Sequence, residues 1–168
     1  VSLLEDSAYA NAWYEERKLE RLPATVENRY LCLTMARCHI QHQEYQKAYT
    51  LLNCLLGPLR AQGRVLDVIE ALLLSAICRR RMGIGEDTWR PLLTEAMELA
   101  QPYGYTALFA ELGVALLPLL REISWPEHQE FLAQLRQAVW QQVQRYPGYL
   151  MESHINAFLL LDLDLEGA

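Results

Sequence analysis

Apolar residues recur at steps of three and four along almost the whole chain, with polar residues between them. This spacing matches the helical period of about 3.6 residues, and no sustained alternation of period two, which would indicate strands, occurs before the last few residues. The segments are also rich in residues that favour helices, such as Leu, Ala, Glu and Gln. The pattern predicts an all-α fold, with helices over residues 3–19, 26–42, 44–62, 65–82, 87–101, 105–122, 126–146 and 150–161.

Glycine and proline mark several features of these helices. Gly63, Gly83 and Gly104 follow predicted helices, where a glycine in the left-handed conformation commonly ends a helix. Pro58 and Pro118 fall inside predicted helices, where each removes one backbone hydrogen bond and is expected to kink the helix. Because the next predicted helix begins within a few residues of each of these glycines, the connections between helices are expected to be short.

The chain also contains an internal repeat. Ala36 and Ala76 are 40 residues apart, a period typical of stacked antiparallel helix pairs. Ala36 and Ala48 are 12 residues apart, with Tyr45 in the turn between them, and Thr88 takes the later position in the second pair. Small residues at this spacing let two helices approach closely, and they resemble those of the tetratricopeptide (TPR) repeat. The sequence predicts a TPR-like α-solenoid of antiparallel helix pairs.

Several motifs extend this resemblance over about residues 5–150. They are the IEALLL run at 69–74, the pattern A-x-P-x-G-Y at 100–105 and RYPGYL at 145–150. In content and order the chain is similar to the helical-repeat sensor segment of the large LuxR-type transcriptional activators related to the maltose-regulon activator. The resemblance implies a TPR-like sensor or interaction domain at 1–150, followed at 151–168 by a short helix and a tail.

In that family a nucleotide-binding module precedes the repeats and a helix-turn-helix domain follows them, so the resemblance implies both as neighbours in a parent chain. No GxxxxGK[ST] phosphate loop occurs in the sequence, and the chain stops where the DNA-binding domain is expected. The sequence also begins with Val1 and not with Met. We therefore expect the chain to be a piece of a longer protein.

The formal net charge of −6 is distributed unevenly. Residues 1–84 carry 11 Lys and Arg against 9 Asp and Glu, whereas residues 85–168 carry 4 against 12. Because nucleic-acid affinity depends on clustered Lys and Arg, we expect no direct contact with nucleic acid. The apolar runs fall far short of the roughly 20 residues that span a membrane. The four cysteines lie within apolar helical patterns, as reduced thiols would, and a cytoplasmic location is expected.

The stretch CHIQH at 38–42 carries residues that can ligate a metal. Cys38 and His42 are four residues apart and share a helix face. Structural zinc, however, requires four ligands, and no CxxC or HExxH motif supplies the others. The alternative interpretation is a polar turn between paired helices, with Cys38 facing the partner helix. We favour the turn and predict no metal site.

Two further features allow a chemical and a structural interpretation. Arg79, Arg80 and Arg81 form the densest basic cluster; they could clamp a phosphate or a carboxylate, or they could stabilise a helix C-terminus. The Gly-Ile-Gly at 83–85 could suggest a dinucleotide-binding loop, but such a motif follows a strand and no strand is predicted here. We therefore predict an ordinary loop. No candidate nucleophile comes with a motif that supplies a base and an orienting acid. We predict no enzyme and no cofactor.

The candidate binding surface is the concave face of the solenoid, which the first helix of each pair lines in TPR-like stacks. With Ala36 and Ala76 as equivalent positions, this face carries Tyr30, Leu33, Arg37, Gln41, Glu70, Leu73, Arg80 and Arg81. Such a groove could hold a small polar inducer, such as an oligosaccharide or a carboxylate, that shifts an inactive-to-active equilibrium. The seam around Tyr103, Tyr105 and Phe109 is the second choice for a pocket.

Two other functions stay open. The same face could dock an acidic helix or peptide as a protein-interaction module, or mediate self-association, without any small molecule. The period of about 40 residues also fits a HEAT-like scaffold. The partners expected from the sequence are therefore a small-molecule inducer or a protein partner on the concave face, besides the neighbouring domains of the parent chain.

Overall fold

The computed structural model describes residues 8–145, where the regular secondary structure is helical throughout. The α-helices are α1 (Ala8–Arg17), α2 (Arg29–Gln41), α3 (Tyr45–Ala61), α4 (Val65–Arg81), α5 (Arg90–Ala100), α6 (Ala107–Leu112), α7 (Leu117–Glu122) and α8 (Gln129–Val143). Single turns of 3-10 helix are η1 (Glu86–Thr88), η2 (Gln101–Tyr103), η3 (Gly113–Ala115) and η4 (Pro126–His128). The all-α prediction is confirmed. The helix expected at 150–161 and the tail at 151–168 lie outside the described residues.

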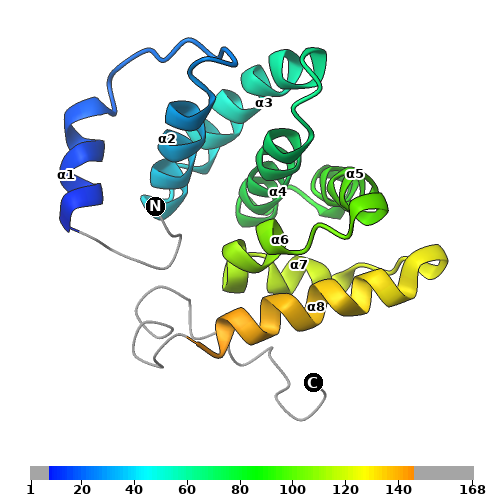
Figure 1. Cartoon of the computed structure of the whole chain (residues 1–168). Coiled ribbons are helices and arrows are strands. Elements are labelled where there is room, and N and C mark those ends of the chain that lie inside the picture. Colours follow the sequence, from blue (N-terminus) through cyan, green and yellow to red (C-terminus); the bar gives the residue numbers. More distant parts are fainter. Residues whose placement is uncertain (1–7, 146–168) are drawn as a thin grey trace.

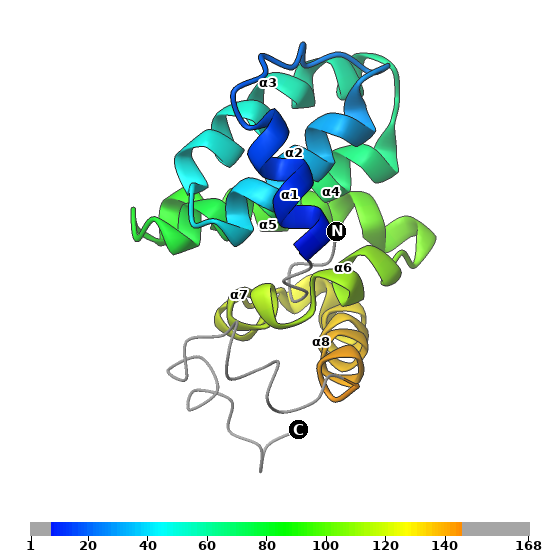
Figure 2. The same ribbon diagram turned by 90° about the vertical axis from the view of Figure 1, so that its left-hand side faces the viewer.

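The helices form a stack of antiparallel pairs (Figure 1). The first pair consists of α2 and α3 and the second of α4 and α5, whereas α6, α7 and α8 pack together as a third unit. α4 also packs against α3 and α6, so that the second pair lies between the other two. α1 stands beside α2 at one end of the stack (Figure 2). Neighbouring units therefore bury each other's apolar faces, as in a solenoid. In this described part of the chain, no helix combines the length and the apolarity needed to cross a membrane.

The small residues of the predicted repeat lie in the core. The fully buried ones are Ala36, Ala48 and Ala76. Thr88 is not their equivalent in the second pair, because it lies in η1, ahead of α5, where it is half-buried. The connection after α4 is longer than the turn after α2, and α5 instead buries Ala96 and Ala100.

The predicted helix ends are confirmed at three glycines. Gly63, Gly83 and Gly104 have φ angles of 64°, 67° and 63°, the left-handed region that residues with a side chain rarely adopt. Gln43 adopts the same region, with φ 60°, at the turn between α2 and α3. Because Gln43 is not a glycine, sequence reasoning did not single it out.

The prediction of one helix over 105–122 is wrong. The chain forms α6, the 3-10 turn η3 and then α7, and the break lies at Gly113, whose φ of 47° and ψ of −122° are unsuited to a residue with a Cβ. Pro118 consequently lies in the first turn of α7 and interrupts no helix interior. Pro58 does lie inside α3, as predicted. Gly57 precedes it and has no Cβ to clash with the proline ring.

The third unit is tied together by an arginine that sequence reasoning missed. Arg136 on α8 donates from Nε and Nη2 to the carbonyl oxygen of Leu120, at 2.9 and 2.8 Å, and from Nη2 to that of Ile123 at 2.8 Å. These carbonyls belong to the last turn of α7 and the residue after it, which have no helical partner. Burial lowers the pKa of Arg136. The guanidinium therefore acts as a side-chain cap for α7.

Replacing Gly113 by alanine tests the break between α6 and α7. Alanine is the better helix former, yet it would be strained at a positive φ, so Gly113→Ala should lower the free energy of unfolding by about 1–3 kcal/mol. Chemical denaturation measures this change. The control Gln137→Ala, at an exposed position on α8, should stay within about 0.5 kcal/mol of the original chain. A stabilised Gly113→Ala variant would show that α6 and α7 can join into one helix.

Candidate functional site

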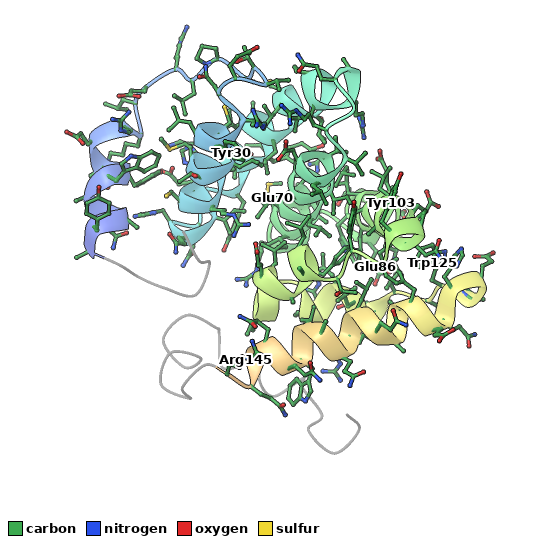
Figure 3. All side chains as sticks on the ribbon, viewed as in Figure 1. Tyr30, Glu70, Glu86, Tyr103, Trp125 and Arg145 are labelled. Atoms are coloured by element: carbon green, nitrogen blue, oxygen red, sulfur yellow. The ribbon has the colours of Figure 1, made fainter. Side chains whose placement is uncertain are left out.

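The residues predicted for the concave face all lie on α2 and α4, but they do not form one open surface. Leu33 and Leu73 are only 3% and 0% exposed and belong to the hydrophobic core. Each of these helices packs against neighbours on several sides, so its apolar positions have no access to a ligand. Tyr30 and Glu70, labelled in Figure 3, lie on these two neighbouring helices.

The two charged residues at the centre of the predicted face bind each other. Arg37 donates to Glu70 Oε1 from Nη2 at 2.8 Å and from Nε at 3.1 Å. Both side chains are largely buried, at 12% and 18% exposed. Glu111 on α6 lies 3.9 Å from the same arginine nitrogen. Arg37 therefore joins α2 to α4, and this pairing leaves it poorly suited to bind a ligand.

The remaining predicted residues are dispersed. Arg80 binds Glu122 on α7, whereas Arg81 is exposed and Gln41 is half-buried. Tyr30 is 65% exposed, and the guanidinium of Arg29 lies 4.2 Å from the centre of its ring. Among the eight predicted residues, the structure therefore leaves one exposed aromatic side chain and pairs two of the arginines with carboxylates.

The arginine run ends α4, in agreement with its structural interpretation. Arg79, Arg80 and Arg81 lie in the last turn of α4, where cations interact favourably with the helix dipole. The guanidinium of Arg79 also lies 4.0 Å from the centre of the Tyr49 ring on α3. The run therefore stabilises the helix end and its neighbours.

Residues 38–41 form the last turn of α2, and the predicted polar turn between the paired helices follows at residues 42–44, before α3 begins at Tyr45. Cys38 is buried in a small cluster with Met35 and with Tyr14 of α1, and Leu51 of the paired helix α3 packs against the same cluster. Between residues 8 and 145, no three His, Cys, Asp or Glu side chains gather in a way that could hold a metal ion.

A hydrogen-bonded group that sequence reasoning missed lies beside this turn. We call Tyr14, His39 and Glu44 the Tyr14 cluster. The Tyr14 hydroxyl donates to Glu44 Oε2, and His39 Nδ1 lies 2.9 Å from both that oxygen and the hydroxyl. Lys47 donates to the other oxygen of Glu44 at 2.8 Å. Tyr14 also stacks on the ring of His42, with 4.1 Å between ring centres. The cluster therefore fastens α1 to the first helix pair.

The cluster fixes the protonation states of its members. Burial and the hydrogen bond to Glu44 raise the pKa of Tyr14, so the phenol keeps its proton. Burial lowers the pKa of His39, and Glu44 only partly opposes this. Burial also acts to raise the pKa of Glu44, but hydrogen bonds from Lys47, Tyr14 and His39 outweigh it and lower the value to about 2. At neutral pH an ionised carboxylate therefore accepts from a phenol and a neutral imidazole.

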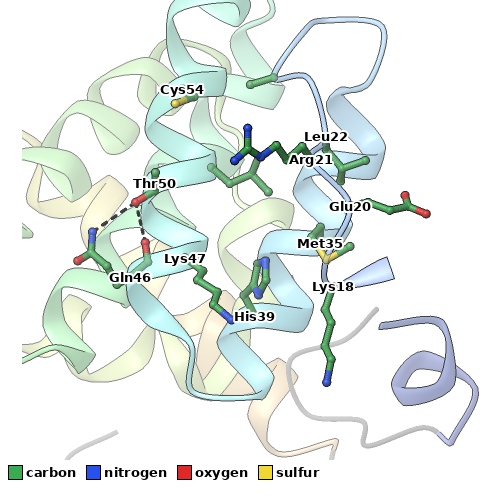
Figure 4. Close-up of a pocket in the computed structure, with 12 residues that line it drawn as sticks. Lys18, Glu20, Arg21, Leu22, Met35, His39, Gln46, Lys47, Thr50 and Cys54 are labelled. Carbon is green, nitrogen blue, oxygen red and sulfur yellow. Dashed lines mark hydrogen bonds between the residues drawn. The ribbon is translucent and has the colours of Figure 1, made fainter. Parts of the chain in front are cut away.

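A cavity lies next to the cluster, which we call the linker cavity. It has a volume of about 660 Å³ and lies between the linker at residues 18–24 and the helices α2 and α3 (Figure 4). Its apolar lining comes from Leu22, Ala24, Met35 and Leu51. Its cations are Lys18, Arg21 and Lys47, against the single carboxylate of Glu20. His39 also lines it, so the cavity and the Tyr14 cluster share a residue.

The sequence pattern did not predict this cavity. The residues at 18–24 end a predicted helix and begin a connection, and such segments carry no periodic signal that shows where they fold back. One weak signal existed, because His39 is a polar residue within the apolar pattern of α2 and is 7% exposed in the structure. The seam around Tyr103, Tyr105 and Phe109 was the second choice for a pocket. There Phe109 is fully buried, and the rings of Tyr103 and Tyr105 stack with 5.1 Å between their centres.

Comparison with known proteins identifies one family. The family described as the MalT-like TPR region matches residues 2–125, well over half of the chain. None of the curated proteins and none of the solved structures matches at a significant level. The resemblance drawn from the sequence motifs is thereby confirmed, as is the TPR-like helical repeat.

Removing the Tyr14 hydroxyl tests the cluster. Tyr14→Phe takes away a hydrogen bond to a charged acceptor without changing the apolar packing, so the free energy of unfolding should fall by about 1.5–3 kcal/mol. Tyr9→Phe, at a highly exposed position of the same helix, is the control and should change it by less than about 0.5 kcal/mol. Equal effects of the two variants in chemical denaturation would show that the Tyr14 hydroxyl does not hold α1.

The cluster also predicts a pH dependence of stability. The pKa of His39 is lowered from 6.5 by burial in the folded chain, so the unfolded chain binds more protons just below pH 6.5 and stability is lost as the pH falls through this range. The pKa of Glu44, lowered from 4.5 to about 2, acts only at lower pH.

Unfolding free energies measured at pH 7 and pH 5 check this. His39→Gln should reduce the decrease in unfolding free energy between pH 7 and pH 5. The control His128→Gln, at a half-buried site on η4, should leave this decrease unchanged. An unchanged loss in His39→Gln would assign the pH dependence to other groups.

Proposed function

We propose, because the chain belongs to the family of MalT-like TPR regions, that it is the effector-sensing segment of a LuxR-type, ATP-dependent transcriptional regulator in the cytoplasm. Helical-repeat domains of this kind are generally regulatory and not catalytic. The observation that carries the sensing function is the linker cavity, because its volume of about 660 Å³ lies in the range of small-molecule sites.

The linker cavity is a better place for the effector than the concave face. At the concave face, Arg37 and Glu70 satisfy each other and the leucines are buried. In the linker cavity, cations and an apolar lining face the same open space. A ligand there would contact both the segment that follows α1 and the first helix pair.

Such a ligand would act by selecting one arrangement of α1. A ligand shifts an equilibrium only if it binds the two states with different affinity. The linker at 18–24 supplies one wall of the cavity and the paired helices supply the other, so the complete site exists only while the linker rests on the stack. The neighbouring nucleotide-binding and helix-turn-helix domains of the proposed parent chain would then respond to the position of α1.

A second candidate function is the docking of a protein partner. It is favoured by two exposed apolar side chains, Tyr30 at 65% and Leu66 at 49%, near the starts of α2 and α4. The ion pair between Arg29 and Asp67, at 3.1 Å, holds these two helix starts together. Exposed aromatic residues beside an arginine are typical of protein interfaces.

A thermal-shift screen of sugars, sugar phosphates and carboxylates distinguishes the two functions. An effector at about 100 times its dissociation constant adds roughly 2.7 kcal/mol to the folded state, which for a domain of this size raises the melting temperature by roughly 5–11 °C. Thr50→Trp, which fills part of the linker cavity from α3, should abolish the shift, and the exposed control Gln62→Trp should retain it. A screen without any stabilising compound would favour the docking function.

A further inference from the structure

The chemistry of the linker cavity identifies the class of its ligand, an inference that rests on the proposed sensing function. The cavity combines three cations with one carboxylate. In Figure 4 the guanidinium of Arg21 extends across the cavity toward α3, whereas the carboxylate of Glu20 points away from it. The charge presented to a ligand is therefore positive.

The three cations are not equally available. Lys18 binds Glu15 at 2.5 Å, and Lys47 binds Glu44 at 2.8 Å. Arg21, in contrast, has no hydrogen bond or ion pair with any residue of the described part of the chain. A guanidinium binds a carboxylate or a phosphate through two parallel hydrogen bonds, so Arg21 is suited to hold an anionic group.

The rest of the lining is suited to an apolar body. Leu22 from the linker, Met35 from α2 and Leu51 from α3 form a wall of side chains without hydrogen-bonding groups. A neutral oligosaccharide would leave most of its hydroxyl groups unpaired against such a wall, which is costly. An alkyl or aromatic group, in contrast, gains free energy in proportion to the apolar area that it buries there.

We propose that the linker cavity binds a small organic anion with an apolar body, whose anionic group Arg21 holds and Lys47 supports. Lys47 belongs to both sites, because it already donates to Glu44 of the Tyr14 cluster. His39 is likewise shared between the cavity lining and the cluster. A bound ligand would therefore contact residues whose hydrogen bonds fasten α1 to the first helix pair.

Three probes with the same alkyl chain test this ligand class. Octanoate and octyl phosphate carry an anionic group, and octanamide is their neutral counterpart; all three are used below the concentrations at which they aggregate. Titration calorimetry on the full chain should show binding of the two anions and at least tenfold weaker binding of the amide. The ratio of the dissociation constants of octanoate and octyl phosphate shows which anionic group the site prefers.

Arg21→Gln should weaken the binding of octanoate or octyl phosphate about tenfold or more, because it removes a charge-assisted pair of hydrogen bonds. The matched control is Arg64→Gln, an exposed arginine between α3 and α4 that does not line the cavity. This control should bind the anions as the original chain does. Both variants change exposed side chains, and their melting temperatures verify that the fold is kept.

Cys54 offers a second readout in the same cavity. It is exposed and lines the cavity, whereas Cys32, Cys38 and Cys78 are buried. Burial raises the pKa of each of these three thiols, that of Cys78 to about 12, so iodoacetamide should alkylate Cys54 first. Mass spectrometry should show that octanoate slows this alkylation in the original chain and not in Arg21→Gln.

The outcomes separate this proposal from the proposed function. Equal binding of octanamide and octanoate, or undiminished anion binding by Arg21→Gln, would overturn the anionic class. Stabilisation by a neutral compound from the wider screen, with no response to either anion, would also overturn it and leave ligand sensing in place. If no compound of any class binds, the proposed function fails together with the ligand class.

Discussion

Each unit of the stack is joined to the next by an arginine on the earlier unit and a carboxylate on the later one. The first two pairs are joined by Arg29–Asp67, Arg37–Glu70 and Arg60–Glu95, and the second pair is joined to the third unit by Arg80–Glu122. In every one of these four pairs the arginine precedes its carboxylate in the sequence. The units of a solenoid cannot bury their apolar faces alone, and these pairs specify which face meets which.

The ion pairs contribute unequally to this arrangement. Arg60–Glu95 is exposed on both sides, and such pairs contribute only about 0.2–1 kcal/mol. Arg37–Glu70 is largely buried, so the loss of Arg37 would leave the Glu70 carboxylate poorly solvated and without this counter-charge, at a cost of about 3–5 kcal/mol. The buried pair therefore acts mainly against misaligned stacking, because a shifted register would separate Arg37 from Glu70. The same pairing leaves Arg37 poorly suited to bind a ligand.

Local patterns predicted the helices and the pairing, whereas contacts between distant residues decided the site. The spacing of Ala36, Ala48 and Ala76 identified buried helix faces, because helical periodicity is read within a few turns. The same reasoning placed Leu33 and Leu73 on an open face, although a helix inside a stack packs against neighbours on several sides and buries them. The break at Gly113 was missed because its neighbours keep the apolar pattern across it. The linker cavity depends on how residues 18–24 fold back, which no period encodes.

The energetics of α1 support the proposed regulatory role of the linker cavity. Only Ala10 and Tyr14 are buried on α1 among its described residues, whereas α4 buries ten residues. The attachment of α1 therefore depends strongly on the Tyr14 cluster, in which each hydrogen bond to the charged carboxylate contributes about 1.5–3 kcal/mol. A ligand at about 100 times its dissociation constant supplies roughly 2.7 kcal/mol, which is of the same size. Because the linker that follows α1 forms one wall of the cavity, the proposed ligand, at ordinary affinity, would shift the equilibrium between attached and detached α1.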